Sequence, residues 1–474
     1  MTMLVSKDNE RILANDFSLE FLEAKLTQKA AIAPVVYTGP AGLVVGDDGV
    51  LMLKLYHRFQ DADEFKREIE SAFGPGHEAG RLIGDEHYFD FTGTDMHGTV
   101  WTSSKIWVTG DVSLPASGRV VQAKLRSIES DLSYGIGPVG AAPRALVIVR
   151  GDFAIPWNAL ETHDGTTSRS VCELTVAGRR CSLFKREGHT EVRIDLAEAE
   201  SAENDIERIL EGLSICLGKR LRPKVVKIIK PESHVQRVHS DSSDKEHGTL
   251  SLIAPIPTKR ADGASSIQHF LDRYMAANPL PYSALFGFWH RVLTASSSGV
   301  ENHALVLTTS IEGLLKTYFS ELGKPEAAFI KEVEEAIPVL RALSVGERAK
   351  SRAMASLQSA KGPAAKTALY ALRDRSIISD QHAALWSRLR NKSAHADELG
   401  LSEGELQTYL DELHGCLELF YRLIFAHLDY RGPMFAHSQP RWPEINFDGQ
   451  LKRASVEHTV SDSTAIQVTT TKGG

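Results

Sequence analysis

Residues 402–427 read SEGELQTYLDELHGCLELFYRLIFAH, and this stretch decides the fold of the C-terminal part of the chain. Ser402 and Glu405 have the spacing of a capping box, in which the two side chains bond to the free N–H groups at a helix start. Large side chains then recur in alternating steps of four and three, which places them on one helix face. The spacing therefore predicts a long helix over 402–429 with one core-facing stripe, made of Leu406, Leu410, Leu413, Leu417, Phe420, Ile424 and His427.

The same helical spacing extends back to about residue 265. Residues 264–431 are therefore expected to form an all-α domain, a helical bundle. Before it, residues 231–263 are rich in Ser, Asp, His, Lys and Pro and cannot bury enough apolar surface to fold alone, so they are expected to be a linker. Residues 432–474 are aperiodic and are interpreted as an appendage with a disordered end. The remaining helices are expected near 265–277, 283–297, 301–321, 326–343, 364–375 and 380–391.

Residues 1–230 have a different pattern. From about Val35 to Leu196, short β-branched or aromatic runs alternate with glycine turns, which is typical of a mainly antiparallel β domain. Two runs, 172–176 and 180–186, flank Ala177-Gly178-Arg179 as the strands of a hairpin would, and a helix is expected over 203–217. The predicted fold class is therefore α+β and multidomain, with a β-rich N-terminal domain followed by the helical bundle.

Composition limits the classes of protein that this chain can be. It has 474 residues, 42% of them hydrophobic, which suits two or three domains, and its net charge of −7 argues against bulk coating of nucleic acid. No run is apolar enough for a membrane span, and the start lacks the apolar core of a signal peptide, so we expect a cytoplasmic protein with no membrane partner. The four cysteines form no CxxC pair and are interpreted as reduced, small hydrophobic residues.

Several short motifs have no support from the sequence around them. Gly135, Gly137 and Gly140 spell GxGxxG, but Pro138 interrupts the motif and a strand follows it, so a loop is expected instead of a dinucleotide site. The chain has no P-loop, HExxH or GxSxG sequence, and we expect no metal and no cofactor. The basic run over 218–230 is either a solvated edge or a nucleic-acid contact.

The sequence LWSRLRNKSAHA over 385–396 stands out. It resembles the LRN…AH signature of HEPN domains, helical bundles in which an Arg-x4–6-His motif serves metal-independent RNA cleavage in many members. Arg390, Asn391 and His395 match that signature. The context is also similar to HEPN bundles of the ApeA-like type, because Glu312 lies on an earlier long helix and a long apolar helix follows the motif. The resemblance covers about 265–430.

The resemblance implies an endoribonuclease. A histidine near neutrality can move the proton of a 2′-hydroxyl or of a leaving 5′-oxygen, which fits His395. The planar guanidinium of Arg390 suits phosphate in the transition state. The resemblance also implies a homodimer through the helical domain, because two motifs commonly share one cleft. Lys392 and Arg388 are further candidates for contact with the RNA substrate.

Other polar residues of the helical part have a structural interpretation as well as a functional one. A second Arg-x4-His pair, Arg422 and His427, is separated by LIFA on the last helix, so His427 is expected to be a core histidine. Glu312 lies on or beside a core face and should pair with Arg390 or His395, or else it is a flanking residue at the edge of the stripe. Asn391 either orients the site or caps a turn.

The preferred hypothesis is a HEPN-type, metal-independent endoribonuclease of a bacterial toxin or anti-phage defence system, a role that the ApeA-like resemblance alone implies. The N-terminal domain would then sense a trigger, phage-derived or a protein, or restrain the nuclease. One alternative is a non-catalytic HEPN-like bundle that binds RNA, a nucleotide or a protein. Another is a carbohydrate- or protein-binding β module fused to a dimerisation bundle.

Overall fold

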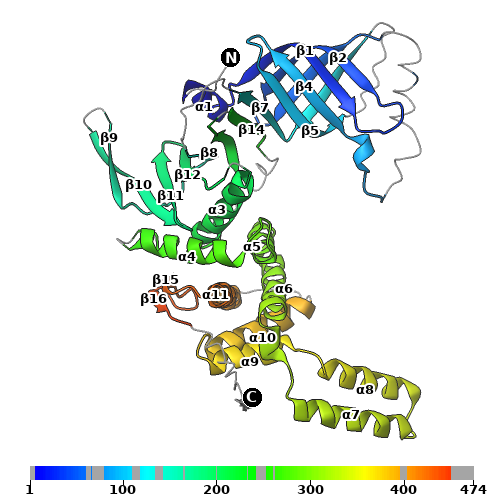
Figure 1. Cartoon of the computed structure of the whole chain (residues 1–474). Helices are drawn as coiled ribbons and strands as arrows, with labels where there is room; N and C mark the ends of the chain where they lie inside the picture. Colours follow the sequence, from blue (N-terminus) through cyan, green and yellow to red (C-terminus); the bar gives the residue numbers. More distant parts are fainter. Residues whose placement is uncertain are drawn as a thin grey trace, which may run out of the picture.

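The computed structural model describes residues 6–59, 66, 80–108, 118–133, 142–163, 166–198, 200–231, 233–241, 252–259, 262–395 and 403–449. An antiparallel β part comes first and a helical part follows, which confirms the predicted α+β class (Figure 1). Gly135, Gly137 and Gly140, and the end of the chain predicted to be disordered, lie outside the described residues.

Six antiparallel strands close into a barrel. They follow the order β1-β2-β3-β6-β5-β4, and β4 pairs again with β1, so the ring has no free edge. A short helix, α1, precedes the barrel, and a 3-10 turn, η1, precedes β4. The bounds are α1 Ser6–Leu13, β1 Ser18–Gln28, β2 Val36–Val45, β3 Leu51–His57, η1 Asp85–His87, β4 Phe89–Asp95, β5 Val100–Val108 and β6 Arg119–Leu125.

The barrel interior is filled by alternate side chains of its strands. Phe21 and Phe91 meet edge to face with ring centroids 5.2 Å apart. Trp101 is fully buried, and its indole Nε1 donates a hydrogen bond to Asp95 Oδ2 at 3.1 Å. Asp95 Oδ1 also accepts from the backbone N–H of Thr99, so this buried carboxylate is satisfied by the β4–β5 turn.

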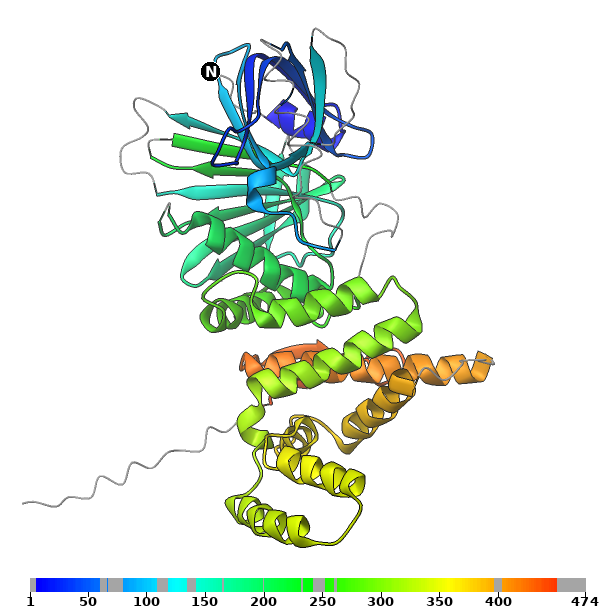
Figure 2. The ribbon, with the colours of Figure 1, turned by 90° about the vertical axis from the view of Figure 1, so that its right-hand side faces the viewer.

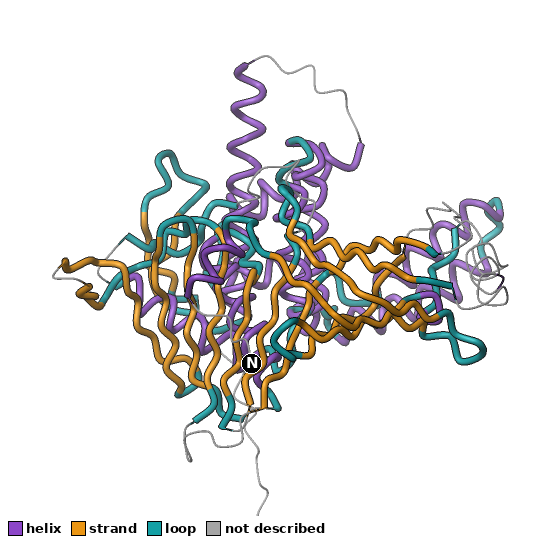
Figure 3. Tube along the Cα trace, turned by 90° about the horizontal axis from the view of Figure 1, so that it is seen from above, coloured by secondary structure: helices purple, strands orange, loops and turns teal. Residues whose placement is uncertain are grey.

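A second sheet continues from the barrel, because β7 pairs with β5. Its order is β7-β14-β13-β8-β12-β11-β10-β9, all antiparallel, and Figure 3 shows the strands in two groups. The predicted hairpin is confirmed, since Val176 pairs with Arg179 across Ala177 (φ 50°) and Gly178 (φ 77°), as in a type I′ turn. The bounds are β7 Ser127–Ser133, β8 Arg144–Arg150, β9 Ala159–His163, β10 Thr166–Val176, β11 Arg179–Arg186, β12 His189–Asp195, β13 Pro223–Ile229 and β14 Ser233–His239.

Strands β13 and β14 correct two expectations. The linker predicted over 231–263 contains β14, which lies inside the sheet between β7 and β13, so that prediction is wrong for residues 233–239. The basic run is also not a solvated edge, because β13 is a central strand that buries Lys224 and Lys227. Lys224 Nζ lies 3.1 Å from Asp241 Oδ1 and donates to the Gly49 carbonyl, and burial lowers the pKa of Lys227 to about 8.

Helix α3 (Ala202–Leu217) joins the sheet to the helical part. It packs against α4 (Gly263–Ala277), and a Cβ at Gly212 would lie 2.6 Å from Leu271 Cδ2, so a larger residue there would require the Leu271 side chain to move. Helix α4 in turn packs on strand β10, and its Asp272 Oδ1 accepts a hydrogen bond from the Ala177 amide in the turn that follows this strand. Figure 2 shows α3 and α4 beneath the second sheet.

The helical part follows the predicted helices closely, with one addition. Helix α8 was not expected, and α10 is longer than expected. The bounds are α5 Ala284–Ala295, α6 Val300–Tyr318, η3 Ser320–Gly323, α7 Ala327–Ala342, α8 Glu347–Ala360, α9 Ala365–Asp374, α10 Asp380–His395 and α11 Glu403–His427. Helices α7 and α8 pack on each other and project away from the rest (Figure 1).

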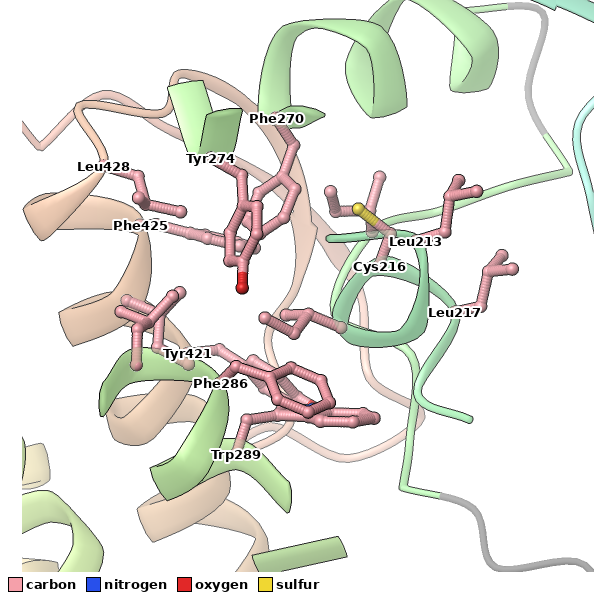
Figure 4. Packing of buried hydrophobic residues seen from close by; sticks show 14 of the residues in the cluster. Leu213, Cys216, Leu217, Phe270, Tyr274, Phe286, Trp289, Tyr421, Phe425 and Leu428 are labelled. Carbon is pink, nitrogen blue, oxygen red and sulfur yellow. The ribbon is translucent and has the colours of Figure 1, made fainter. Parts of the chain in front are cut away.

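Helix α11 lies at the centre of the helical core. It packs against α6 and α10, and its segment from Cys416 to Ala426 is buried except at Arg422. The predicted appendage forms a hairpin on this helix, with β15 (Gly432–Phe435) and β16 (Glu444–Phe447) burying Met434 and Phe447. Figure 4 shows side chains of α3, α4, α5 and α11 in one cluster, so the core is continuous from the second sheet to the last helix.

Candidate functional site

Helix α10 carries the Arg-x4-His motif, and its inner face fixes it in the bundle. Trp386 and Leu389 are buried, and the Trp386 Nε1 donates a hydrogen bond of 3.1 Å to the Thr308 carbonyl of α6. Arg390 follows on the outer face, with 47% of its side chain exposed. The helix therefore presents Arg390 to solvent from a rigid support.

Glu312 of α6 holds this arginine. Both Nε and Nη2 of Arg390 donate to Glu312 Oε2, at 3.1 and 3.0 Å. Lys316, one turn further along α6, lies 2.6 Å from Oε1 of the same carboxylate. Hydrogen bonds from Lys316 and then from Arg390 lower the pKa of Glu312, which therefore stays ionised at neutral pH. Glu312 is thus both partnered by Arg390 and placed at the edge of the apolar stripe.

Arg388 and Lys392 have a shared partner that the sequence did not reveal. Arg388 Nε lies 2.9 Å from Glu412 Oε1, and Lys392 Nζ lies 2.8 Å from Oε2 of the same residue. Glu412 is on α11 and nearly buried, whereas the two cations are about half exposed. These contacts attach α10 to α11 and neutralise part of the positive charge near Arg390.

The motif lies within a helix, where a boundary after about residue 391 was expected. Helix α10 continues through His395, so the Cα of His395 lies about 140° around the helix axis from that of Arg390. The His395 side chain lies outside the described part of the structure. Asn391 is exposed, and within the described residues its side chain makes no hydrogen bond.

The side chains of the second Arg-x4-His pair, Arg422 and His427, contact other residues of the helical core. His427 is half-buried, its ring centroid is 3.9 Å from that of Tyr318, and burial lowers its pKa. Arg422 Nε donates to Glu418 Oε1 at 2.7 Å, and its Nη1 donates to the Ile377 carbonyl. Both side chains of this pair therefore serve packing between helices.

A buried polar cluster between α10 and α11 was missed. Glu418, almost fully buried, accepts from Arg422 and from the Ser438 amide and lies 3.2 Å from His382 Nε2. Burial alone would raise the pKa of Glu418, but the hydrogen bonds from His382 and Ser438 and the charge of Arg422 hold it below its ordinary value. A glutamate inside the apolar run CLELFY was the available signal.

The described residues give little support for a metal site or a reactive cysteine. They contain no group of three or more His, Cys, Asp or Glu residues arranged to hold a metal ion. The four cysteines are buried and unpaired, and burial raises the pKa of Cys172 to about 12. Among the described helices, none has the length and apolar character to cross a membrane.

No family model, curated protein or solved structure matches this chain. The candidate site is therefore defined by its own geometry. The partly exposed guanidinium of Arg390 is oriented by the Glu312 carboxylate. Both motif residues lie in the last turns of α10, which ends at His395. The guanidinium can bind a phosphate through the donors that Glu312 does not use, because an arginine has five N–H groups.

Proposed function

We propose that the helical part is a HEPN-like bundle and that the protein is a metal-independent endoribonuclease. The observation that carries the proposal is the contact between Arg390 and Glu312. Two donors of the guanidinium are held by Glu312 while 47% of the side chain remains exposed. An arginine of the motif that served only packing would not need a carboxylate to orient it while so much of its side chain stays exposed.

In the proposed reaction, the 2′-hydroxyl of the RNA attacks the adjacent phosphorus, and the bond from phosphorus to the 5′-oxygen breaks. The hydroxyl loses its proton, the leaving oxygen gains one, and a 2′,3′-cyclic phosphate forms. His395 would transfer one of these protons. Arg390 would stabilise the charge on the phosphoryl oxygens through its remaining N–H groups. Asn391 and Glu312 would support the site.

Two copies would complete the site. One motif supplies one histidine, whereas the reaction has one proton to remove and one to donate. A homodimer through the helical part would bring two motifs to one cleft, and the β-rich part would sense a phage-derived or protein trigger. The cellular role in anti-phage defence or as a toxin belongs to the same proposal.

The second candidate is a non-catalytic module that binds RNA, a nucleotide or a protein. One observation favours it: Arg388, Arg390 and Lys392 all form ion pairs within the chain. Their charges would then serve the packing of α10 against α6 and α11.

Activity separates the two candidates. The full chain is incubated with total RNA, and His395→Ala is compared with His427→Ala as the matched control. We expect His395→Ala to abolish cleavage and His427→Ala to retain it in the folded fraction, with Arg390→Ala resembling His395→Ala and Arg390→Lys recovering only in part. Equal cleavage by wild type and His395→Ala would favour the non-catalytic module.

A further inference from the structure

The outer surface of the barrel carries a cavity that the proposed reaction does not use. It has a volume of about 340 Å³ and lies over β3, β6 and β5. Its lining includes Met52, Trp107, Arg119, Gln122 and Lys124. A cavity of this size is at the lower end of ligand pockets and holds about one base or one ring system.

Strand register places these side chains in rows. Lys124 on β6 pairs with Met52 on β3 and with Trp107 on β5, so the cation lies between an apolar and an aromatic side chain. Two residues along the strands, Lys54 pairs with Gln122. Alternate residues of a strand share a face, so this row also points outward.

The surface continues beyond the cavity to a second aromatic side chain. Tyr56 pairs with Val120, and these side chains are 55% and 47% exposed. Tyr56 is four residues from Met52, or about 13 Å along the strand. Aromatic side chains therefore stand at both ends of a track that carries Lys124 beside Trp107 and has Lys54 and Gln122 in its middle.

The track is positively charged. Among the described residues that line the cavity, none is a carboxylate, whereas Lys124 and Arg119 are cations, and the Arg119 guanidinium also lies over the Tyr37 ring. Within the described residues, the side chains of Lys54, Gln122 and Lys124 form no hydrogen bond or ion pair, so they are available to a ligand. Cations interleaved with aromatic side chains on a strand surface suit a chain of phosphates and bases.

We propose that this barrel face binds single-stranded RNA, with a base stacked on Trp107 in the cavity and phosphates bound by Lys124 and Lys54. The choice of RNA over DNA rests on the proposed function, whereas the stacking and phosphate contacts do not. The barrel would thus supply a substrate-binding surface in addition to the nuclease site on α10.

Binding is measured by fluorescence anisotropy with the full chain carrying His395→Ala, so that the RNA stays intact. The probe is a labelled, unstructured 12-nucleotide RNA, with a 2′-deoxy strand of the same sequence beside it. We expect Trp107→Ala to weaken binding roughly tenfold (about 1.4 kcal/mol), because an aromatic side chain stacks on a base. Trp107→Phe should retain most of the affinity.

Matched controls come from the second sheet. Trp157 is 45% exposed with Arg169 over its ring at 4.5 Å, so Trp157→Ala removes an exposed indole elsewhere. Lys124→Gln should reduce the slope of log affinity against log salt by about 0.7, the value for one phosphate contact on a single strand. Lys185→Gln, an exposed lysine of β11, should leave that slope unchanged.

The proposal is overturned if wild type does not bind the strand, if Trp157→Ala weakens binding as much as Trp107→Ala, or if a mononucleotide binds as tightly as the 12-mer. A protein ligand that needs Trp107, without RNA binding, would also overturn it. Binding that depends on Trp107 in a protein that never cleaves RNA would refute only the proposed nuclease.

Discussion

The two histidines of the Arg-x4-His pairs differ in what surrounds them. His427 stacks on Tyr318, so His427→Ala should lower the free energy of unfolding by about 1 to 2 kcal/mol through a lost contact and a cavity. His395→Ala should change it by less than about 0.5 kcal/mol, because residues at helix ends contribute little packing. Urea unfolding of both variants measures the difference. If His395→Ala unfolds the protein, its loss of cleavage is no evidence for a catalytic role of His395. That result would favour the non-catalytic module.

The cluster of Glu418, His382 and Arg422 makes an acid-sensitive contact. The folded pKa of Glu418 is below its ordinary 4.5, so its stabilising contribution is present above about pH 4.5 and is lost as the pH falls through the folded value. Glu418→Gln should therefore cost about 2 kcal/mol at pH 7, because it leaves the partly buried Arg422 without its carboxylate. The loss relative to wild type should shrink as the pH falls below 4.5.

His437 lies near this cluster and must be separated from it. Burial lowers the pKa of His437 from 6.5 to about 4, so the unfolded chain binds more protons and stability falls between pH 6.5 and 4. Because the charge of Glu418 raises the pKa of His437, wild type and Glu418→Gln are both compared in a His437→Gln background, where that loss is absent. The difference between their thermal melts at pH 7, 5 and 4 isolates Glu418, and a constant difference over that range would contradict the assigned pKa direction.

At the level of single residues, the sequence predicted a contact where a residue had only a few possible partners. Glu312 was predicted beside a core face, where a carboxylate requires a positively charged partner, and Arg390 of the motif was one such residue. Glu412 could not be paired with Arg388 and Lys392 in advance, because they lie 24 and 20 positions before it and their contact depends on how α10 lies against α11. The burial of Lys224 likewise depends on which strands flank β13.

Among the helices, α10 begins with a reciprocal contact. The Ser379 amide donates to His382 Nδ1 at 3.1 Å, and the His382 amide donates to Ser379 Oγ at 3.3 Å. This resembles a capping box with histidine in the third position. Ser379→Ala should lower the free energy of unfolding by about 1 kcal/mol. Ser387→Ala, in the middle of the same helix, is the control and should cost nothing; equal losses in both variants would contradict the capping role.

Helices with a clear apolar stripe were predictable, and those without one were not. Helix α8 buries no side chain and packs mainly on α7, so its sequence has no apolar stripe that would have predicted it. Helix α10 was expected to end at Asn391 because polar residues follow, but Ser393 stays on the helix, its Oγ 3.4 Å from Thr308 Oγ1. Strand β14 was hidden because its buried face includes His234 and Gln236.

For the whole molecule, the core does not divide at the predicted linker. Phe270 and Tyr274 of α4 pack in one cluster with Leu213 and Cys216 of α3 (Figure 4). A fragment starting near residue 265 would expose this surface, so oligomeric state is best measured on the full chain. We expect the full chain to sediment as a dimer at tens of micromolar. A monomer with full nuclease activity would contradict the shared cleft.

The chemistry of the RNA ends tests the central claim most directly. The full chain is incubated with RNA in EDTA, and the product ends are identified by mass spectrometry. The account predicts cleavage in EDTA, with 2′,3′-cyclic phosphate and 5′-hydroxyl ends that disappear in His395→Ala. Cleavage that EDTA abolishes and a divalent metal restores, or products with 3′-hydroxyl ends, would contradict it.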